Sequence, residues 1–426
     1  MFFMPFQVLG VWLRGWFSLA LLVAGGFLLY QWYSVRRDAP DEIAATDIAP
    51  AHAERGLSPA SSDVASDDSA AVAAAQRRKA REYALFIAGL GLLMWGLGGG
   101  LTPAVLWRPS GDAPPAQVEG VTHRLERPDG TTIVAEVLGP ADGVPLVLTH
   151  GWGLDHNEFC YLKDALAAEY RLIVWDLPGL GRSTGPRNKD WSLEKLAQDL
   201  HAVIGLAGGR PAILVGHSIG GMILLTYCRL FREALGSRVS GLVLAQSTYT
   251  NPVQTTSLAT LYAALQKPVL EPLCHLMIWF SPLVWLLNWL SYFNGSAHRS
   301  THRSAFSGNE SREQLKFLTR YYVAAWPAVV ARGMLGMFRY DASDVLPLIQ
   351  IPTLVIAGDR DTTCQPAASA AMAAAIPRSD LVTLESSKHC GLFEHHEEFR
   401  RVLTGFAKSL EGDQPEFAQR RSTEAA

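Results

Sequence analysis

The chain has 426 residues, a length that suggests about two or three domains. Lysine and arginine total 37 and aspartate and glutamate total 40, so the net charge of −3 gives no basic excess for general nucleic-acid binding. Apolar residues make up 49% and charged residues 18%, and the mean hydropathy of +0.11 indicates membrane segments. The five cysteines form no CxxC pair, which excludes a zinc ribbon and a disulfide-stapled scaffold.

Residues 1–107 contain two uncharged segments and are predicted to form a membrane anchor. Residues 15–33 carry no charge, and about 20 such residues cross a bilayer as a helix. Tryptophan and tyrosine gather near the ends of this segment, as is typical of membrane interfaces. A cleaved signal peptide is the competing interpretation, but the N-terminus is apolar and no small-residue cleavage site precedes Arg36. Residues 84–107 form the second predicted transmembrane helix.

Residues 38–76 lie between these segments and are rich in alanine, aspartate, serine and proline. With almost no large apolar residue, they are predicted to form a disordered linker. Six basic residues flank the linker and three flank the opposite ends of the two segments. The positive-inside rule therefore places the linker in the cytoplasm and everything after residue 108 outside it, at a bacterial-type inner or plasma membrane.

Residues 118–411 alternate between strand and helix patterns. Several strand candidates are continuous apolar runs, as expected when helices cover both faces of a sheet. Strands are predicted at 131–138, 145–149, 171–175, 212–215, 241–245, 353–357 and 381–384, and helices at 192–206, 221–231, 367–376 and 397–410. This alternation predicts an α/β fold with a mostly parallel sheet, and chemistry is expected where its strands end.

The strand at 212–215 runs into the segment Gly-His-Ser-Ile-Gly-Gly at 216–221 and then a helix. A serine on so tight a turn needs small neighbours, and the glycines at 216 and 220 provide them. The helix that follows supplies free N–H groups and positive potential for an oxyanion. Ser218 is therefore the candidate nucleophile, the alternative being a glycine-rich turn with an incidental serine.

A serine hydroxyl needs a base, and the base needs an acid that orients it. Two later strands end at candidates for these roles, because Asp359 and Asp361 follow one strand and His389 follows the next. Asp361 is preferred as the acid because it lies farther beyond its strand and can reach back to an imidazole. Asp359 is expected to shape the turn.

An oxyanion hole needs a second N–H besides that of the residue after the nucleophile. The strand at 145–149 ends in His-Gly-Trp-Gly at 150–153, where glycines let the backbone turn its amides inward. The backbone N–H groups of Trp152 and Ile219 are the predicted donors. The indole of Trp152 either walls the substrate pocket or simply packs in the core.

Together these motifs resemble the α/β-hydrolase fold family, in its serine esterase and lipase-like branch. The resemblance covers about 118–411 apart from a central insertion, and it rests on HGWG at 150–153, DLPGLGRS at 176–183, GHSIGG at 216–221, GDRD at 358–361 and His389. It implies a catalytic triad of nucleophile Ser218, base His389 and acid Asp361, with an acyl-serine that water resolves. The serine at 218 separates the chain from the similar haloalkane dehalogenases and epoxide hydrolases, which use aspartate there.

Residues 250–345 are predicted to form a helical lid, because similar proteins carry a lid at this insertion. Its segment 269–293 is very apolar, and prolines break it into pieces too short to span a bilayer. The segment is either a helix pair packed on the core or an apolar lid that contacts the membrane and admits a long acyl chain. In the second case Trp279, Trp285 and Trp289 are candidate pocket residues alongside Trp152.

Two further features bear on a metal or a disulfide. His298 and His302 are four residues apart, but no third ligand stands out, so no metal site is predicted. Cys364 and Cys390 flank the two predicted catalytic loops, and they are either small buried fillers or a bridge between the loops.

The sequence thus predicts a membrane-anchored serine hydrolase that cleaves a carboxylic ester of a lipid or another hydrophobic acyl compound, with no cofactor. Its catalytic domain is expected at 108–249 and 346–411, followed by a disordered tail at 412–426. Acyl transfer to an alcohol or cofactor-free perhydrolysis remains open, and so does a non-catalytic membrane-bound ligand-binding protein. The expected partners are a small-molecule or lipid ester and the membrane, with no nucleic acid, and the oligomeric state is left open.

Overall fold

The computed structural model describes residues 4–38, 62–98, 113–116 and 118–411. Its centre is an eight-stranded sheet in the order β1-β2-β4-β3-β5-β6-β7-β8, in which only β2 runs antiparallel to its neighbours. The strands are β1 (Val121–Glu126), β2 (Thr132–Leu138), β3 (Pro145–Thr149), β4 (Arg171–Trp175), β5 (Ala212–His217), β6 (Val239–Ala245), β7 (Thr353–Gly358) and β8 (Ser379–Leu384). All seven predicted strands are present, and the eighth, β1, is an edge strand whose partly exposed polar sequence gives little apolar signal.

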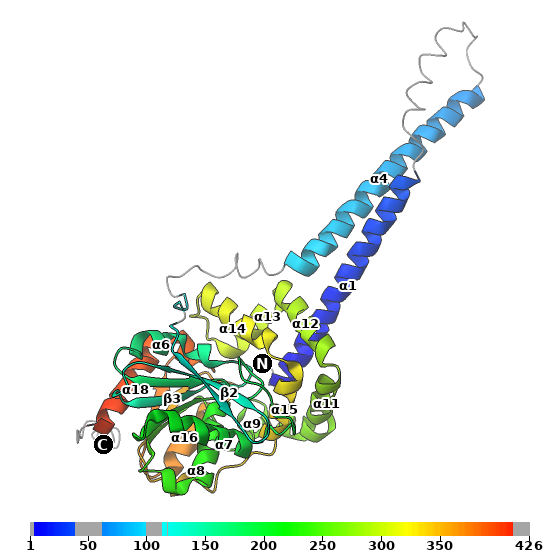
Figure 1. The fold of residues 1–426 in the computed structure, drawn as a ribbon. Coiled ribbons are helices and arrows are strands. Elements are labelled where there is room, and N and C mark those ends of the chain that lie inside the picture. Colours follow the sequence, from blue (N-terminus) through cyan, green and yellow to red (C-terminus); the bar gives the residue numbers. More distant parts are fainter. Residues whose placement is uncertain (1–3, 39–61, 99–112, 117, 412–426) are drawn as a thin grey trace.

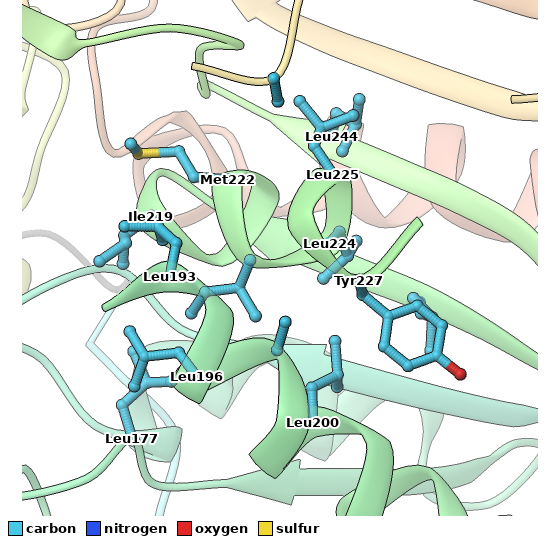
Figure 2. Packing of buried hydrophobic residues seen from close by; sticks show 14 of the residues in the cluster. Leu177, Leu193, Leu196, Leu200, Ile219, Met222, Leu224, Leu225, Tyr227 and Leu244 are labelled. Carbon is cyan, nitrogen blue, oxygen red and sulfur yellow. The ribbon is translucent and has the colours of Figure 1, made fainter. Parts of the chain in front are cut away.

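Helices cover both faces of the sheet, as predicted (Figure 1). Helices α7 (Leu193–Ile204), α8 (Ile219–Leu230) and α16 (Pro366–Ala375) share one apolar core with alternate strand residues such as Val147 and Leu214. Helices α6 (Cys160–Leu166) and α18 (His396–Glu411) pack on the other face, against Leu148 and Val215. Figure 2 shows how leucines of α7 pack against α8, and this packing positions the helix that follows Ser218.

Helices between β6 and β7 occupy the insertion where the lid is predicted. They are α9 (Pro252–Thr255), α10 (Ala259–Leu265), α11 (Glu271–Trp279), α12 (Ser281–Phe293), α13 (Ser296–Ala305), α14 (Arg312–Ala324) and α15 (Pro327–Met337). The path from α10 through α11 to α12 is bent by 97° at Phe280, just before Pro282. The lid lies between the sheet domain and the N-terminal helices (Figure 1).

The N-terminal helices α1 (Met4–Arg37) and α4 (Ser62–Gly98) form a hairpin that projects away from the sheet domain (Figure 1). Residues 13–37 and 72–97 are long and apolar enough to cross a membrane. The helices meet closely at two glycines, where a Cβ on Gly25 would lie 2.9 Å from the carbonyl oxygen of Gly89. A larger residue at either position would push the helices apart.

The prediction of a disordered linker is wrong for one part of the segment. Residues 62–76 belong to α4 instead of a disordered segment, because this stretch is rich in alanine, the strongest helix former, and continues into the apolar helix. Residues 39–61, the predicted helical residues 99–107 and the predicted tail at 412–426 lie outside the described residues.

Candidate active site

Ser218 lies on the sharp turn between β5 and α8, at the carboxyl edge of the sheet. Its φ of 55° and ψ of −119° are a strained backbone conformation for a residue with a side chain. The neighbouring glycines permit this turn. A Cβ on Gly216 would lie 2.4 Å from the carbonyl carbon of Gly220, and one on Gly220 would lie 2.2 Å from the carbonyl oxygen of Thr149. The strand–serine–helix turn therefore requires small residues at both positions.

The structure brings Ser218, His389 and Asp361 into one chain of hydrogen bonds. His389 Nε2 lies 3.0 Å from Ser218 Oγ, and His389 Nδ1 lies 2.8 Å from Asp361 Oδ2. The other carboxylate oxygen of Asp361 accepts hydrogen bonds from the backbone N–H groups of Thr363 and Cys364 at 2.7 and 3.1 Å. Both His389 and Asp361 are buried, so the hydrogen bond to Asp361 holds the imidazole in one orientation.

Asp359, the alternative acid, does not reach the imidazole. Its Oδ1 accepts the backbone N–H of Ser387 at 2.8 Å, which ties the loop after β7 to the loop that carries His389. This is the turn-shaping position expected for it.

The backbone N–H groups of Trp152 and Ile219 have no hydrogen-bond acceptor within the part of the chain that the structure describes. Ile219 is the first residue of α8, where a helix leaves its N–H groups unpaired. The side chain of Trp152 is buried, and its indole N–H donates to the carbonyl oxygen of Val330 at 2.9 Å. Its ring lies so close to α15 that a Cβ on Gly333 would meet it at 2.0 Å. The lid thus holds the loop that carries Trp152.

Known proteins share this sequence pattern and fold. The sequence pattern of the alpha/beta hydrolase family matches residues 146–402, more than half of the chain. The chain belongs to this family. A pimeloyl-(acyl-carrier protein) methyl ester esterase of Aeromonas salmonicida is 25% identical over 269 residues, which are 62% of this chain and 95% of that protein. The AB hydrolase superfamily protein YisY of Bacillus subtilis is 24% identical over 288 residues, 67% of this chain and 99% of that protein.

Solved structures agree on the fold of this alpha/beta hydrolase. A thermophilic esterase from Thermogutta terrifontis superposes with a TM-score of 0.55 at 23% identity, covering 69% of this chain and all of that one. A membrane phospholipase A described as a bacterial virulence factor superposes with a TM-score of 0.53 at 21% identity, covering 68% of this chain and 87% of that one. The family match begins at residue 146, so the helical hairpin lies outside it.

A buried ion pair beneath the site was not predicted from the sequence of this alpha/beta hydrolase. Glu158 Oε1 lies 2.6 Å from His217 Nδ1, and both side chains are almost wholly buried. Glu158 Oε2 accepts the backbone N–H of Gly151 at 2.7 Å, and His217 Nε2 donates to the carbonyl oxygen of His389 at 2.7 Å. The pair therefore joins the Trp152 loop, the Ser218 turn and the His389 loop.

The electrostatics favour the charged form of this pair. Burial opposes it, but the carboxylate of Glu158, the carbonyl of His389 and the charge of Asp361 together outweigh burial and raise the pKa of His217 above its ordinary value. The imidazolium of His217, the backbone N–H of Gly151 and the charge of His150 in turn together outweigh burial at the carboxyl group and lower the pKa of Glu158. Nε2 of His217 faces a carbonyl oxygen and Nδ1 faces the carboxyl group of Glu158, an arrangement that suits an imidazolium beside a carboxylate.

A cavity of about 120 Å³ lies between the lid and the loops of the hydrolase that carry Trp152 and His389. Four residues of the sheet domain line it, namely Trp152, Gly153, Thr363 and His389, together with these lid residues: Asn288, Ala297, Ser300, Thr301, Ser304, Ala305, Tyr322, Val323 and Val330. Trp152 thus lines this cavity. Trp279, Trp285 and Trp289 do not line it, because small residues of α13 face the cavity while Trp279 faces solvent and Trp285 packs on Trp326.

Cys364 and Cys390 are free thiols in this structure and do not form the bridge that the sequence left open. Both are buried, and burial raises their thiol pKa values well above the ordinary range. Such thiols are poor nucleophiles. They fill space behind the two loops.

One further cluster has ligand types that suit a metal. Asp155, His156 and Asp176 bring three ligand atoms within 4.8 Å of one another. The cluster is already paired, because His156 Nδ1 lies 2.7 Å from Asp176 Oδ1, and the backbone N–H of Arg182 donates to the other carboxylate oxygen. These contacts shape the 176–183 loop of the hydrolase, so we assign no metal to them.

Proposed function

We propose that this chain is a membrane-anchored serine hydrolase that cleaves carboxylic esters of hydrophobic acyl compounds. The observation that carries the proposal is the pair of hydrogen-bond distances, 3.0 Å and 2.8 Å, that links Ser218, His389 and Asp361. The esterases among its relatives and structural neighbours support ester cleavage as the reaction.

In the proposed mechanism, His389 Nε2 takes the proton of Ser218 as the hydroxyl oxygen attacks the ester carbonyl carbon. The resulting oxyanion accepts hydrogen bonds from the N–H groups of Trp152 and Ile219. His389 then gives its proton to the departing alcohol, which leaves an acyl-serine. Water attacks this acyl group with His389 as base again, releasing the acid and restoring Ser218.

Labelling with a fluorophosphonate tests the serine nucleophile. The detergent-solubilised full-length protein is expected to take up one probe and lose esterase activity, whereas Ser218→Ala is expected to take up none. Ser237→Ala, which removes an exposed serine from a turn, serves as the matched control and is expected to label like the wild type. A wild-type protein that neither labels nor hydrolyses a panel of esters would favour the ligand-binding alternative. Products formed with added alcohol separate hydrolysis from acyl transfer.

We propose that α1 and α4 cross the membrane with the loop between them in the cytoplasm. Arg36 and Arg37 end α1, whereas Arg78 and Arg81 lie within α4 just before its apolar part. Arg78 donates to the carbonyl oxygen of Val35 at 3.2 Å, so the basic stretches of the two helices are level. The catalytic domain then lies outside the cytoplasm.

Cysteine labelling tests this orientation. The five native cysteines are buried, so an introduced cysteine is the reactive one. A membrane-impermeant maleimide is expected to label Ser237→Cys in intact spheroplasts and Ala74→Cys only after lysis, since both positions are exposed in the fold. The reverse pattern would place the catalytic domain in the cytoplasm.

A further inference from the structure

Large apolar side chains are exposed on α11, on α12 and at the bend between them, and we call this set the lid face. Its members are Leu276, Trp279, Phe280, Leu286 and Phe293, with exposed fractions that reach 74% at Trp279 and 53% at Phe280. Aqueous surfaces rarely leave so many large apolar side chains together, and such patches mark contacts with a partner or a membrane.

The lid face continues directly into the membrane hairpin, because α12 packs against α1. The contact is close at Gly15, where a Cβ would lie 2.7 Å from the Leu287 carbonyl oxygen. The Asn294 amide donates to the hydroxyl of Ser18, which is fully buried, and to the carbonyl oxygen of Arg14. Figure 1 shows α12 beside α1 at the point where the hairpin leaves the lid.

The length of the hairpin fixes the depth of this contact. A bilayer core about 30 Å thick takes about 20 helical residues at 1.5 Å each. Counted from the basic end at Arg36, the other boundary falls near Trp16, and it is there that α12 contacts α1. Two exposed arginines of α13, Arg299 and Arg303, lie near Arg14 at this level, where lipid phosphates accept cations.

The same helices separate the cavity from the hairpin. On α12, Asn288 lines the cavity and the adjacent Leu287 contacts α1. On α13, the cavity wall consists of Ala297, Ser300, Thr301, Ser304 and Ala305, spaced at three and four residues along one face. Helices α12 and α13 therefore stand between α1 and the cavity that His389 also lines.

From this arrangement we propose that the lid face lies in the outer part of the bilayer and that the substrate is a lipid-dissolved acyl ester that reaches Ser218 from the membrane between α12 and α13. The inference rests on the proposed esterase function for its substrate and on the hairpin for its depth. Apolar side chains gain most where they enter the acyl region, and the arginines of α13 remain with the headgroups. The bilayer is thus both the partner of the lid and the source of the substrate.

Depth-dependent quenching tests the lid contact without using activity. The full-length protein, labelled with bimane at Trp279→Cys, is reconstituted in equimolar phosphatidylcholine and phosphatidylglycerol vesicles that carry a nitroxide on the acyl chain. Quenching is expected to match that of bimane at Trp95→Cys in the hairpin and to be nearly absent at Leu381→Cys on β8, which is 42% exposed. Equal and weak quenching at positions 279 and 381 would overturn the proposal.

A substrate comparison tests the access route. Trp279→Ser with Phe280→Ser is expected to lower cleavage of a long-chain ester dissolved in the vesicles by about tenfold, while cleavage of a water-soluble acetate ester stays within about twofold. Leu348→Ser with Leu381→Ser, which removes two exposed apolar side chains outside the lid, is expected to change neither rate. Equal losses on both esters, or no loss on either, would overturn the proposal. A wild type that cleaves neither ester while position 279 is quenched would instead contradict the proposed function.

Discussion

Replacing Asp361 with asparagine is expected to lower kcat for ester hydrolysis by about ten-thousandfold while leaving the fold intact. The introduced amide keeps an oxygen for the N–H groups of Thr363 and Cys364, since these two bonds hold Oδ1 in place. Its NH₂ group then faces His389 Nδ1, where the carboxylate oxygen lies 2.8 Å away in the wild type. A donor at that position forces the imidazole proton onto Nε2, which can no longer accept the proton of Ser218.

Steady-state kinetics with a water-soluble ester measure this loss, and circular dichroism checks the fold. Asp359→Asn is the matched control, because Asp359 accepts a backbone N–H from Ser387 and does not touch the imidazole. Its kcat is expected to fall by less than about tenfold. A larger loss for Asp359→Asn than for Asp361→Asn would reverse the assignment of the acid.

Most of the fold and the candidate triad could be predicted from local sequence patterns. The Ser218 turn is encoded in adjacent residues, because a buried strand, two glycines and a helix must follow one another for the serine to project. The order of the later strands placed Asp361 and His389 at the same edge of the sheet. Asp361 was preferred over Asp359 only because it lies farther along the loop that follows its strand.

The lid was less predictable, because its helices α11 and α12 are apolar on nearly every side. In α12 the sequence does not separate Leu287, which is buried against α1, from Leu286, which is 46% exposed. Periodicity identifies an inward face only when the opposite face is polar. The three lid tryptophans therefore suggested pocket walls, whereas the structure lines the pocket with small residues of α13.

The ion pair of Glu158 and His217 has no sequence signature of its own. Glu158 stands among polar and aromatic residues that also suit a surface turn, and its partner lies on a different strand end. Only the packing of the turn after β3 against the end of β5 brings the two side chains together. A buried carboxylate with a distant partner is the kind of feature that pattern analysis misses.

Replacing Glu158 with glutamine is expected to destabilise the protein by about 3–5 kcal/mol, because it leaves the His217 imidazolium buried without its counter-charge. The side chains of the pair are 1% and 2% exposed, so water cannot replace the lost carboxylate. The variant also weakens the acceptor for Gly151 N–H and loosens the loop that carries the proposed oxyanion donor Trp152. A lower kcat is therefore expected below the unfolding temperature as well.

The difference in stability between Glu158→Gln and the wild type is expected to depend on pH. The raised pKa of His217 adds stability that is complete below its ordinary value of 6.5 and is lost as the pH rises through the folded value. The lowered pKa of Glu158 adds stability above its ordinary value of 4.5 and loses it as the pH falls further. Thermal unfolding in detergent should therefore show the largest difference from wild type between pH 4.5 and 6.5, with a decline at alkaline pH.

Glu169→Gln, which removes an exposed partner of Lys408, is the control and should cost less than about 1 kcal/mol. A difference for Glu158→Gln that is equally small, or that grows with rising pH, would contradict a charged pair at this position.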